Sequence, residues 1–302
     1  MRPGPDEPDE APRWDVARPR RPGLVAGVSM AGFRGLGADR VDLRVIPHPA
    51  VMLALQFGPG SPVVDDGAGR RHRGGFAAGL GAGSRGAVRL RGERVEGVQV
   101  RLSPLVARAA LGVAPAELDG AVAGLDDLWG REAQRVREQL EDAVCWERRF
   151  EVAWALLARR IAAGPRVDPE VAWAWHRIAA SRGLARVEGL AAEVGWSRKR
   201  LWSRFQAQTG LPPKQAAKLV RFDHAVHRLA AGEGAAGVAA RGGYADQSHL
   251  HRDVVALTGL TPATVAGEPW LAVDAVAWGA PAGRPAEAGR AVGRARALKQ
   301  EC

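Results

Sequence analysis

The last third of the sequence contains two similar stretches, and this near-duplication limits the folds that the chain can adopt. The first, LAAEVGWSRKRLWSRFQAQTGLPP, covers residues 190–213, and the second, VAARGGYADQSHLHRDVVALTGLTP, covers residues 238–262. The second stretch has one extra residue after its aromatic position. Each copy is typical of a short apolar helix, a glycine turn and a second helix, which is the outline of a helix-turn-helix.

The residues at the turns support this interpretation. Gly195 and Gly243 suit the left-handed backbone of a tight corner between helices. Ser197 and Asp246 follow them and are good N-caps for the second helix of each copy. The segment between the copies predicts one long helix from residue 212 or 213 to about residue 231, with proline at its start and Gly232 after its end.

The second helix of each copy is predicted to have an apolar face and an opposite polar face without a carboxylate at its centre. Leu201 and Leu250 begin the apolar faces, which continue four residues later at Phe205 and Val254. The outward face of the first helix carries Lys199 and Ser203, with Trp202, Gln206 and Arg200 at its flanks. The outward face of the second helix carries Ser248 and Arg252, with His251 and His249 at its flanks. Gln247 falls nearer the core side, but in the first turn its side chain can still reach outward. Arginine and glutamine can read base edges in the major groove, and lysine and serine suit phosphates.

The charge of the chain favours a polyanionic partner. The formal net charge is +10, and residues 166–266 hold fourteen Lys/Arg against eight Asp/Glu. Such a balance indicates nucleic acid or an anionic membrane surface, although an Arg-rich, Ala/Gly-rich composition is also typical of a GC-rich genome. The two matched copies favour nucleic acid.

Residues 166–266 resemble the C-terminal DNA-binding domain of AraC/XylS-type transcriptional regulators. The residues that carry this resemblance are Gly243, Tyr244, Asp246, Gln247, Ser248, His249, Leu250, Arg252, Thr258, Gly259, Thr261 and Pro262, together with Leu190, Ala191, Ser197, Leu201, Phe205 and Gly210 of the first copy. The rest of the chain fits only the general plan of that family, in which an N-terminal β-rich domain senses an effector or mediates dimerisation.

The resemblance implies seven helices and two recognition helices in successive major grooves of double-stranded DNA at a promoter or operator. By position, the base-contacting places of the family fall on Lys199, Trp202 and Ser203, and on Gln247, Ser248, His251 and Arg252. With the adjoining polar residues, the candidate DNA-binding set is Ser197, Arg198, Lys199, Arg200, Trp202, Ser203, Gln247, Ser248, His251 and Arg252. This sequence departs from the family at Val254, where phenylalanine is usual, and at Trp202, where a polar residue is more common.

The N-terminal part predicts a β-rich domain followed by helices, so that the fold class is α+β with an all-α C-terminal domain. Short alternating or apolar runs at residues 41–47, 51–57, 86–92 and 95–104 predict a small antiparallel sheet or barrel that can have one wet face. Residues 131–164 predict a single helix with Val136, Leu140, Val144 and Phe150 on its apolar side. We therefore expect a regulatory domain over residues 23–163, whose helical part at 104–163 couples the domains or forms a dimer contact.

The two ends of the sequence predict little structure. Residues 1–22 hold six prolines, so we expect a disordered tail, and we expect residues 267–302 to be mostly disordered. No signal-peptide h-region and no run of about 18 apolar residues is present, so a cytoplasmic protein that neither enters nor spans a membrane is expected. Cys145 and Cys302 are far apart and predict neither a disulfide framework nor a zinc site.

Other constellations predict no chemistry. His249 and His251 are two positions apart on a helix and face away from each other, which argues against a shared metal, even with Asp246 and Asp253 nearby. His48 and His72 are predicted to be surface residues. The glycine-rich residues 79–86 lack the Lys-Ser/Thr of a phosphate loop. We expect no metal, no cofactor and no catalytic set.

The sequence thus predicts a sequence-specific transcriptional regulator that is not an enzyme. The alternative is that the β domain is the active part, as a small-molecule-binding or enzymatic module, and that the basic domain only localises it. A closed apolar pocket with convergent polar groups in residues 24–104 would favour the alternative. A small-molecule effector at the N-terminal domain and RNA polymerase are candidate partners, and the sequence leaves monomer and homodimer open.

Overall fold

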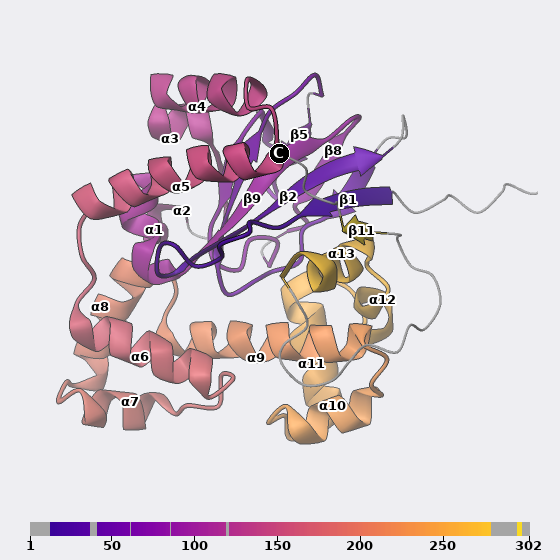
Figure 1. Ribbon diagram of the computed structural model, residues 1–302. Coiled ribbons are helices and arrows are strands. Elements are labelled where there is room, and N and C mark those ends of the chain that lie inside the picture. Colours follow the sequence, from indigo (N-terminus) through magenta and orange to yellow (C-terminus); the bar gives the residue numbers. More distant parts are fainter. Residues whose placement is uncertain are drawn as a thin grey trace, which may run out of the picture.

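A computed structural model describes residues 13–36, 41–60, 62–84, 86–118, 121–278 and 295–297 of the chain. In this described part, a β-rich half with attached helices precedes an all-helical half, as the α+β prediction requires (Figure 1). Across the same ranges, no helix combines the length and the apolar character that crossing a membrane would require.

Two sheets form the β-rich half. Sheet A has the strand order β10-β7-β4-β9-β2-β1-β11 and sheet B the order β3-β8-β5-β6. The strands of sheet A are β1 (Arg13–Ala17), β2 (Val28–Leu36), β4 (Val51–Gln56), β7 (Phe76–Ala78), β9 (Glu96–Leu102), β10 (Val122–Gly124) and β11 (Ala295–Ala297). The strands of sheet B are β3 (Val41–Arg44), β5 (Val63–Asp65), β6 (Arg71–Arg73) and β8 (Arg89–Gly92). Neighbours pair antiparallel except β1 and β11, which are parallel.

The alternation predicted for β9 is present, but both faces of this strand are covered. Val98, Val100 and Leu102 are fully buried in the main core. On the other face, Gln99 is only 6% exposed and Arg101 pairs with a carboxylate of a C-terminal helix. The expectation of a wet face is therefore wrong for this strand of sheet A, because sheet B and the C-terminal helix lie against it. The exposed face belongs to sheet B.

Five helices follow or interrupt the strands: α1 (Pro104–Leu111), α2 (Pro115–Leu118), α3 (Leu125–Trp129), α4 (Arg131–Glu141) and α5 (Trp146–Ala163). The single helix predicted over residues 131–164 is wrong, because it is broken into α4 and α5. Val144, expected on the apolar side, lies in the break and is 94% exposed. The break lets Trp146 begin a new helix whose apolar side meets sheet A.

The contact of α5 with sheet A depends on a glycine in β2, which leaves room for an aromatic ring. The ring of Trp146 lies against Gly32 of β2 so closely that a Cβ atom at this position would collide with it. Trp146 also stacks on Phe150, with ring centroids 6.1 Å apart. Glycine in β2 thus allows the aromatic start of α5 to lie flat on the sheet.

Cys145, just before α5, is disulfide-bonded, whereas the sequence predicted no disulfide framework.

Both tails were expected to be disordered, and this expectation is wrong for the parts of them that the structure describes. Residues 13–17 form β1, in which Trp14 is 1% exposed. Helix α13 (Pro269–Trp278) packs beside it, and Trp270 lies 6.3 Å from Trp14 and 5.3 Å from Phe33 of β2 between ring centroids. Burial of these aromatic rings offsets the entropy of ordering both segments. Residues 1–12, 279–294 and 298–302 lie outside the described residues.

A buried polar cluster joins α13 to both halves of the chain. The carboxylate of Asp274 on α13 accepts a hydrogen bond from Arg101 Nη2 of β9 at 2.5 Å, and His227 Nε2 of the C-terminal half lies 3.4 Å from it. Burial opposes protonation of His227, but the hydrogen bond to Asp274 and the charge of Asp223 raise its pKa to about 9. His227 is therefore a cation at neutral pH, and Asp274 is held between two positive groups.

We predict that Asp274→Asn destabilises the protein by about 3 kcal/mol at pH 7, because it leaves Arg101 and His227 buried without their anion. The raised pKa of His227 also makes the stability of the fold depend on pH. The stabilisation that charged His227 contributes is fully present below pH 6.5 and is lost as the pH rises through about 9.

Urea unfolding between pH 6 and 10 measures both effects. Asp126→Asn, which removes a carboxylate that is 66% exposed, is the matched control and should change the unfolding free energy little. An Asp274→Asn variant as stable as this control at pH 7 would contradict the assignment of the cluster.

Candidate nucleic-acid interface

Seven helices lie between residues 169 and 266, the number that the resemblance implies. They are α6 (Pro169–Ala180), α7 (Val187–Glu193), α8 (Arg198–Thr209), α9 (Pro213–Ala230), α10 (Ala235–Arg241), α11 (Gln247–Thr258) and α12 (Pro262–Ala266). Helices α7 and α8 form the first helix-turn-helix unit, and α10 and α11 form the second. Helix α9 runs between the units (Figure 1).

Both turns use glycine for the predicted reason. Gly195 and Gly243 have φ angles of 66° and 71°, in the left-handed region that favours glycine. Gly243 is also crowded, because a Cβ atom there would collide with Leu184 of the α6–α7 connection. The turn of the second unit is therefore in contact with the first half of the domain.

The N-caps are as expected in both recognition helices. Ser197 Oγ accepts a hydrogen bond from the backbone N–H three residues later at 3.2 Å, and Asp246 Oδ1 does the same at 2.7 Å. Both caps satisfy an N–H that the start of a helix leaves without an intrahelical partner.

The Thr-Gly-Leu ends of α8 and α11 are also equivalent. Thr209 Oγ1 donates to the carbonyl oxygen of residue 205 at 2.9 Å, and Thr258 Oγ1 donates to that of residue 254 at 2.7 Å. Gly210 and Gly259 then end the helices with φ angles of 93° and 70°. The same side-chain bond followed by the same left-handed cap explains why this tripeptide recurs.

The apolar faces of the two helices point into the core. Leu201 and Phe205 in α8, and Leu250 and Val254 in α11, are all fully buried. Val254, the departure from the family pattern, thus fills its core position despite its smaller side chain.

The exposed residues of the two helices occupy equivalent positions, at an offset of 49, although their side chains differ. All ten predicted DNA-binding residues are exposed, namely Ser197, Arg198, Lys199, Arg200, Trp202, Ser203, Gln247, Ser248, His251 and Arg252. Trp202, the unusual residue, is 50% exposed. Gln247, which the helical wheel placed nearer the core, also lies at the surface. These residues are accessible to a partner, although their contacts with DNA stay a prediction.

Several of these side chains keep donors available. Arg252 uses only Nε locally, donating to Ser248 O at 3.3 Å, and it forms no ion pair within the described residues. Arg200 lies over the ring of Trp196, 4.4 Å from its centroid, which holds the guanidinium at the surface of the first unit.

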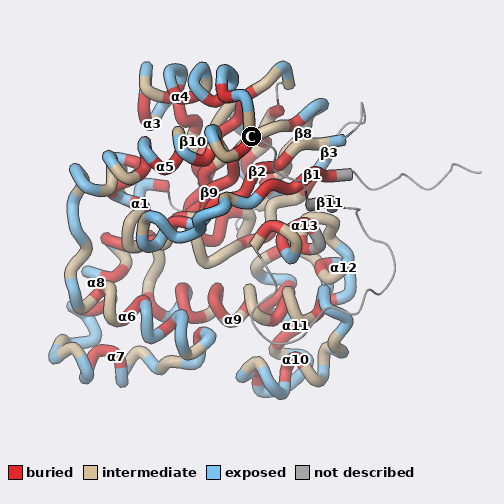
Figure 2. The backbone as a smooth tube through the Cα atoms, in the orientation of Figure 1, coloured by how far each residue is buried: buried red, intermediate tan, exposed pale blue. Residues whose placement is uncertain are grey.

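Helix α9 sets the distance between the units. It has 18 residues and is therefore roughly 27 Å long. One side of it is buried, including Leu219, Phe222 and Val226, as the alternation of buried and intermediate colours along α9 in Figure 2 shows. A buried helix is a stiff spacer, so the separation of α8 and α11 is fixed by packing.

Two ion-pair anchors were missed by sequence reasoning. Arg204 of α8 donates through Nε and Nη2 to the two carboxylate oxygens of Asp168, at 2.8 and 2.9 Å. Asp168 precedes α6, and its backbone N–H also donates to Gln208 Oε1 at 2.8 Å. This bidentate ion pair orients α8 against α6.

In the second unit, Asp253 holds α11 on α9. Its carboxylate lies 3.1 Å from Lys218 Nζ and 3.2 Å from Arg221 Nη2, both on α9. The residue is only 8% exposed. The one sequence signal for this contact is an aspartate next to the apolar face of α11.

The histidines divide into two groups. His249 accepts a hydrogen bond from the backbone N–H of Ala245 at 3.3 Å and packs edge-on against Tyr244, so it has a local packing role. The expectation that His48 and His72 are surface residues is wrong, because their side chains are only 17% and 14% exposed. Burial lowers the pKa of His48 to about 4, despite Asp223 at 3.5 Å.

Within the described ranges, no group of three or more His, Cys, Asp or Glu is arranged to hold a metal ion.

The family comparison agrees with this geometry. Residues 190–267 match the family model of a helix-turn-helix domain. This range begins in α7 and ends directly after α12, so it spans both units and the helix between them. Residues 190–267 therefore form an AraC-type helix-turn-helix domain, which supports a role in DNA-binding transcription regulation.

Three solved structures show some likeness to the chain. ToxT from Vibrio cholerae O395 is 9% identical, with 80% of this chain and 98% of that chain covered and a TM-score of 0.43. The C-terminal domain of AraT, a response regulator from Geobacillus stearothermophilus, is 20% identical over 34% of this chain and 87% of that chain, with a TM-score of 0.32. The AraC-like transcriptional activator CuxR is 16% identical over 67% and 83%, with a TM-score of 0.26. No curated protein matches the chain in sequence.

We predict that Asp253→Asn lowers stability by about 3 kcal/mol and weakens DNA binding mainly at one half of the binding site. Loss of the carboxylate leaves Lys218 and Arg221 without their anion and loosens α11, whereas α8 keeps its own anchor. Urea unfolding and nuclease footprinting measure the two effects.

Glu193→Gln is the matched control for this test, because it removes an exposed carboxylate at the end of α7. Equal weakening of both halves of the footprint by Asp253→Asn would show that Asp253 does not position α11 in particular.

Proposed function

We propose that α8 and α11 enter successive major grooves on one face of double-stranded DNA. The observation that carries this proposal is the set of exposed residues at equivalent positions of two helices that both pack against the stiff helix α9. The spacer is roughly 27 Å long, comparable to the groove repeat of about 34 Å.

The two recognition helices, α8 and α11, present different kinds of side chain to DNA. The first turn of α8 presents Arg198, Lys199 and Arg200, three cations that suit phosphates. Helix α11 presents Gln247 and Arg252, whose side chains can form bidentate hydrogen bonds with adenine and guanine. We infer that α8 supplies more of the salt-dependent affinity and that α11 supplies more of the base selectivity.

The β-rich half acts on DNA binding through direct packing. Helices α1 and α2 contact α8, and Gly210 at the end of α8 lies so close to Pro115 of α2 that a Cβ atom would be 3.0 Å from its carbonyl oxygen. Arg44 Nη1 of β3 donates to the carbonyl oxygen of Thr258 at the end of α11, at 2.8 Å. These contacts support the predicted coupling role of the helices after the sheet. Dimerisation, RNA polymerase as partner and a cytoplasmic location stay predictions.

The alternative function, an enzymatic or ligand-enclosing β domain, has weaker support. The apolar cavity between the two sheets has a volume of only about 70 Å³. Its lining includes Trp14, Leu43 and Gln99. Ligand pockets are usually about 300–1,000 Å³, so this cavity would have to open before it could hold an effector.

We predict that Arg252→Ala and Lys199→Ala weaken DNA binding in different ways. Loss of Arg252 should cost about 1–3 kcal/mol and relax the base preference at one position of the site. Loss of Lys199 should weaken binding to all sequences alike and reduce the slope of log K against log salt by about 1.

Selection of binding sites from a random DNA library, followed by salt titration of the best site, measures both. Arg135→Ala, at an exposed position of α4, is the matched control with the same change in charge. If Arg252→Ala bound its site as tightly and as selectively as the wild type, the assignment of its base contact would be wrong.

We also predict that the DNA site has two parts on one face of the helix, about one helical turn apart. Inserting five base pairs between them turns one part to the opposite face. Because α9 cannot follow this rotation, affinity should fall to that of a single unit. Gel-shift titration checks this, and the intact site and a site with one part scrambled are the references. Unchanged affinity after the insertion would rule out simultaneous docking.

A further inference from the structure

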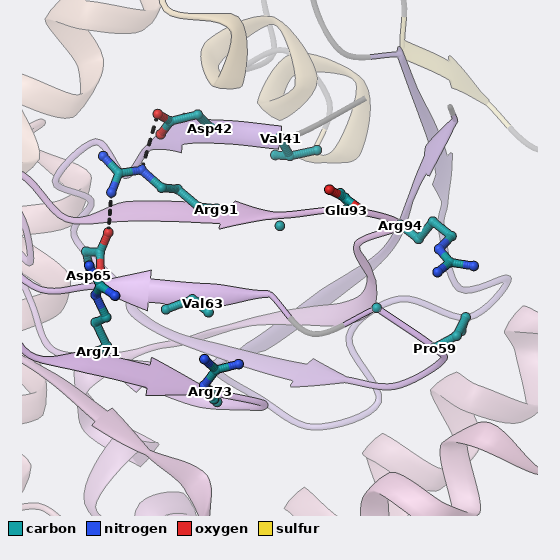
Figure 3. Close-up of a pocket in the computed structure, with 12 residues that line it drawn as sticks. Val41, Asp42, Pro59, Val63, Asp65, Arg71, Arg73, Arg91, Glu93 and Arg94 are labelled. Carbon is teal, nitrogen blue, oxygen red and sulfur yellow. Dashed lines mark hydrogen bonds and ion pairs between the residues drawn. The ribbon is translucent and has the colours of Figure 1, made fainter. Parts of the chain in front are cut away.

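The outer face of sheet B carries an open groove of about 770 Å³ that the proposed function does not use. It is lined from strands β3, β5, β6 and β8 and from the connections β4–β5 and β8–β9. Figure 3 shows these side chains on one face of the sheet. The volume lies within the range typical of small-molecule sites. In Figure 1, β5 and β8 lie far from α7 and α10, on the opposite side of the molecule.

Half of the arginines in the groove are neutralised within the sheet. Arg91 of β8 lies between two carboxylates, with Asp42 at 3.3 Å and Asp65 at 2.6 Å (Figure 3). Arg71 of β6 lies 3.3 Å from the same Asp65. Antiparallel register places these residues on adjacent strands, so they form a cross-strand charge ladder that stabilises the sheet.

The other two arginines have no such partner. Arg73 of β6 and Arg94 of the β8–β9 turn are exposed, and neither side chain makes a hydrogen bond or ion pair with any described residue. In Figure 3 they lie at separate places along the groove, and Val63 and Pro59 are among its other lining residues. The groove thus has two available guanidinium groups and an apolar part of its floor.

The backbone at Arg94 indicates that the side chain itself is required. Its φ angle is 49°, and in the described part only one other non-glycine residue, Arg182, has a positive φ. An L-residue in this conformation costs about 1–2 kcal/mol, whereas glycine costs little. The turn is also held firmly, because a Cβ atom at Gly60 would collide with the carbonyl oxygen of Arg94. Strain of this kind concentrates at functional positions.

We propose that this groove binds a small molecule with two anionic groups, carboxylate or phosphate, one held by Arg73 and the other by Arg94. Guanidinium groups bind both oxyanions in a bidentate way, and Val41, Val63 and Pro59 give the groove an apolar part for the uncharged portion of the ligand. The inference rests on the proposed function only in that such a ligand would act as the effector of the regulator.

The test is isothermal titration calorimetry of the full chain with succinate and with inorganic pyrophosphate, and with acetate at equal ionic strength as the single-charge reference. We expect saturable binding of at least one of the two dianions and none of acetate. Succinate alone would identify carboxylates as the ligand groups, and pyrophosphate alone would identify phosphates. The Arg73→Gln/Arg94→Gln variant should bind that dianion at least about tenfold more weakly.

The matched control is Arg131→Gln/Arg135→Gln, which removes the same charge from exposed positions of α4. It should bind the dianion as the wild type does, with an unchanged melting temperature in all three proteins. Absence of dianion binding to the wild type would overturn the proposal. So would equal loss in both double variants, because general charge would then explain the binding.

DNA binding, measured without the dianion, separates this inference from the proposed function. The groove variant should bind DNA as the control variant does, because Arg73 and Arg94 lie on β6 and the β8–β9 turn, outside both helix-turn-helix units. A groove variant that loses DNA affinity as Lys199→Ala does would make the groove part of the DNA surface and overturn the ligand proposal. A wild type that binds the dianion but no specific DNA would refute the proposed function and leave the groove site intact.

Discussion

The buried side of α9 is the constraint on which the DNA-binding geometry depends. Each unit consists of two short helices, and isolated helices of 7 and 12 residues are marginal in water. Helix α9 provides the apolar surface that both units need, because it contacts α8 of the first unit and both α10 and α11 of the second, as well as α12. The same burial that makes the units stable therefore fixes their spacing, and a chain without this packing would present two recognition helices with no defined relation.

The main core does not stop at the boundary between the two halves. A single cluster of buried residues includes Leu53 and Val100 of sheet A, Phe150 of α5 and Phe222 of α9. Asp274 adds a polar link, since it joins β9 and α9 through one carboxylate. The helix-turn-helix domain is therefore packed against the β-rich half, and a structural change in that half can reach α8 through α2 or α11 through β3 without a flexible linker.

The features that the sequence predicted well are local. The turns at Gly195 and Gly243, the caps at Ser197 and Asp246, and the buried Leu250 follow from spacing and side-chain type over a few residues. The features it predicted poorly depend on residues far apart in the chain. The pairing of Arg204 with Asp168 spans 36 positions, and nothing in the sequence around either residue indicates it.

The wrong predictions have the same cause. Trp14 becomes a core residue only because Trp270, from the other end of the chain, packs beside it. Residues 131–164 look like one helix, but Val144 is left in solvent because sheet A requires two helix directions. His48 is buried because α9, far along the sequence, brings Asp223 to it. Composition and periodicity describe a segment by itself, whereas burial is decided by whatever covers that segment.

The duplicated domain also shows how two copies of one motif can diverge without losing their shared frame. Leu201 and Leu250 in the frame are identical, and Phe205 and Val254 are both apolar, whereas outward positions such as Ser203 and Arg252 differ in chemistry. Core positions must fit a common packing around α9, whereas outward positions are constrained only by the DNA groove that each unit contacts. A non-palindromic site is the expected consequence, because the two recognition helices on this single chain present different donors at equivalent places.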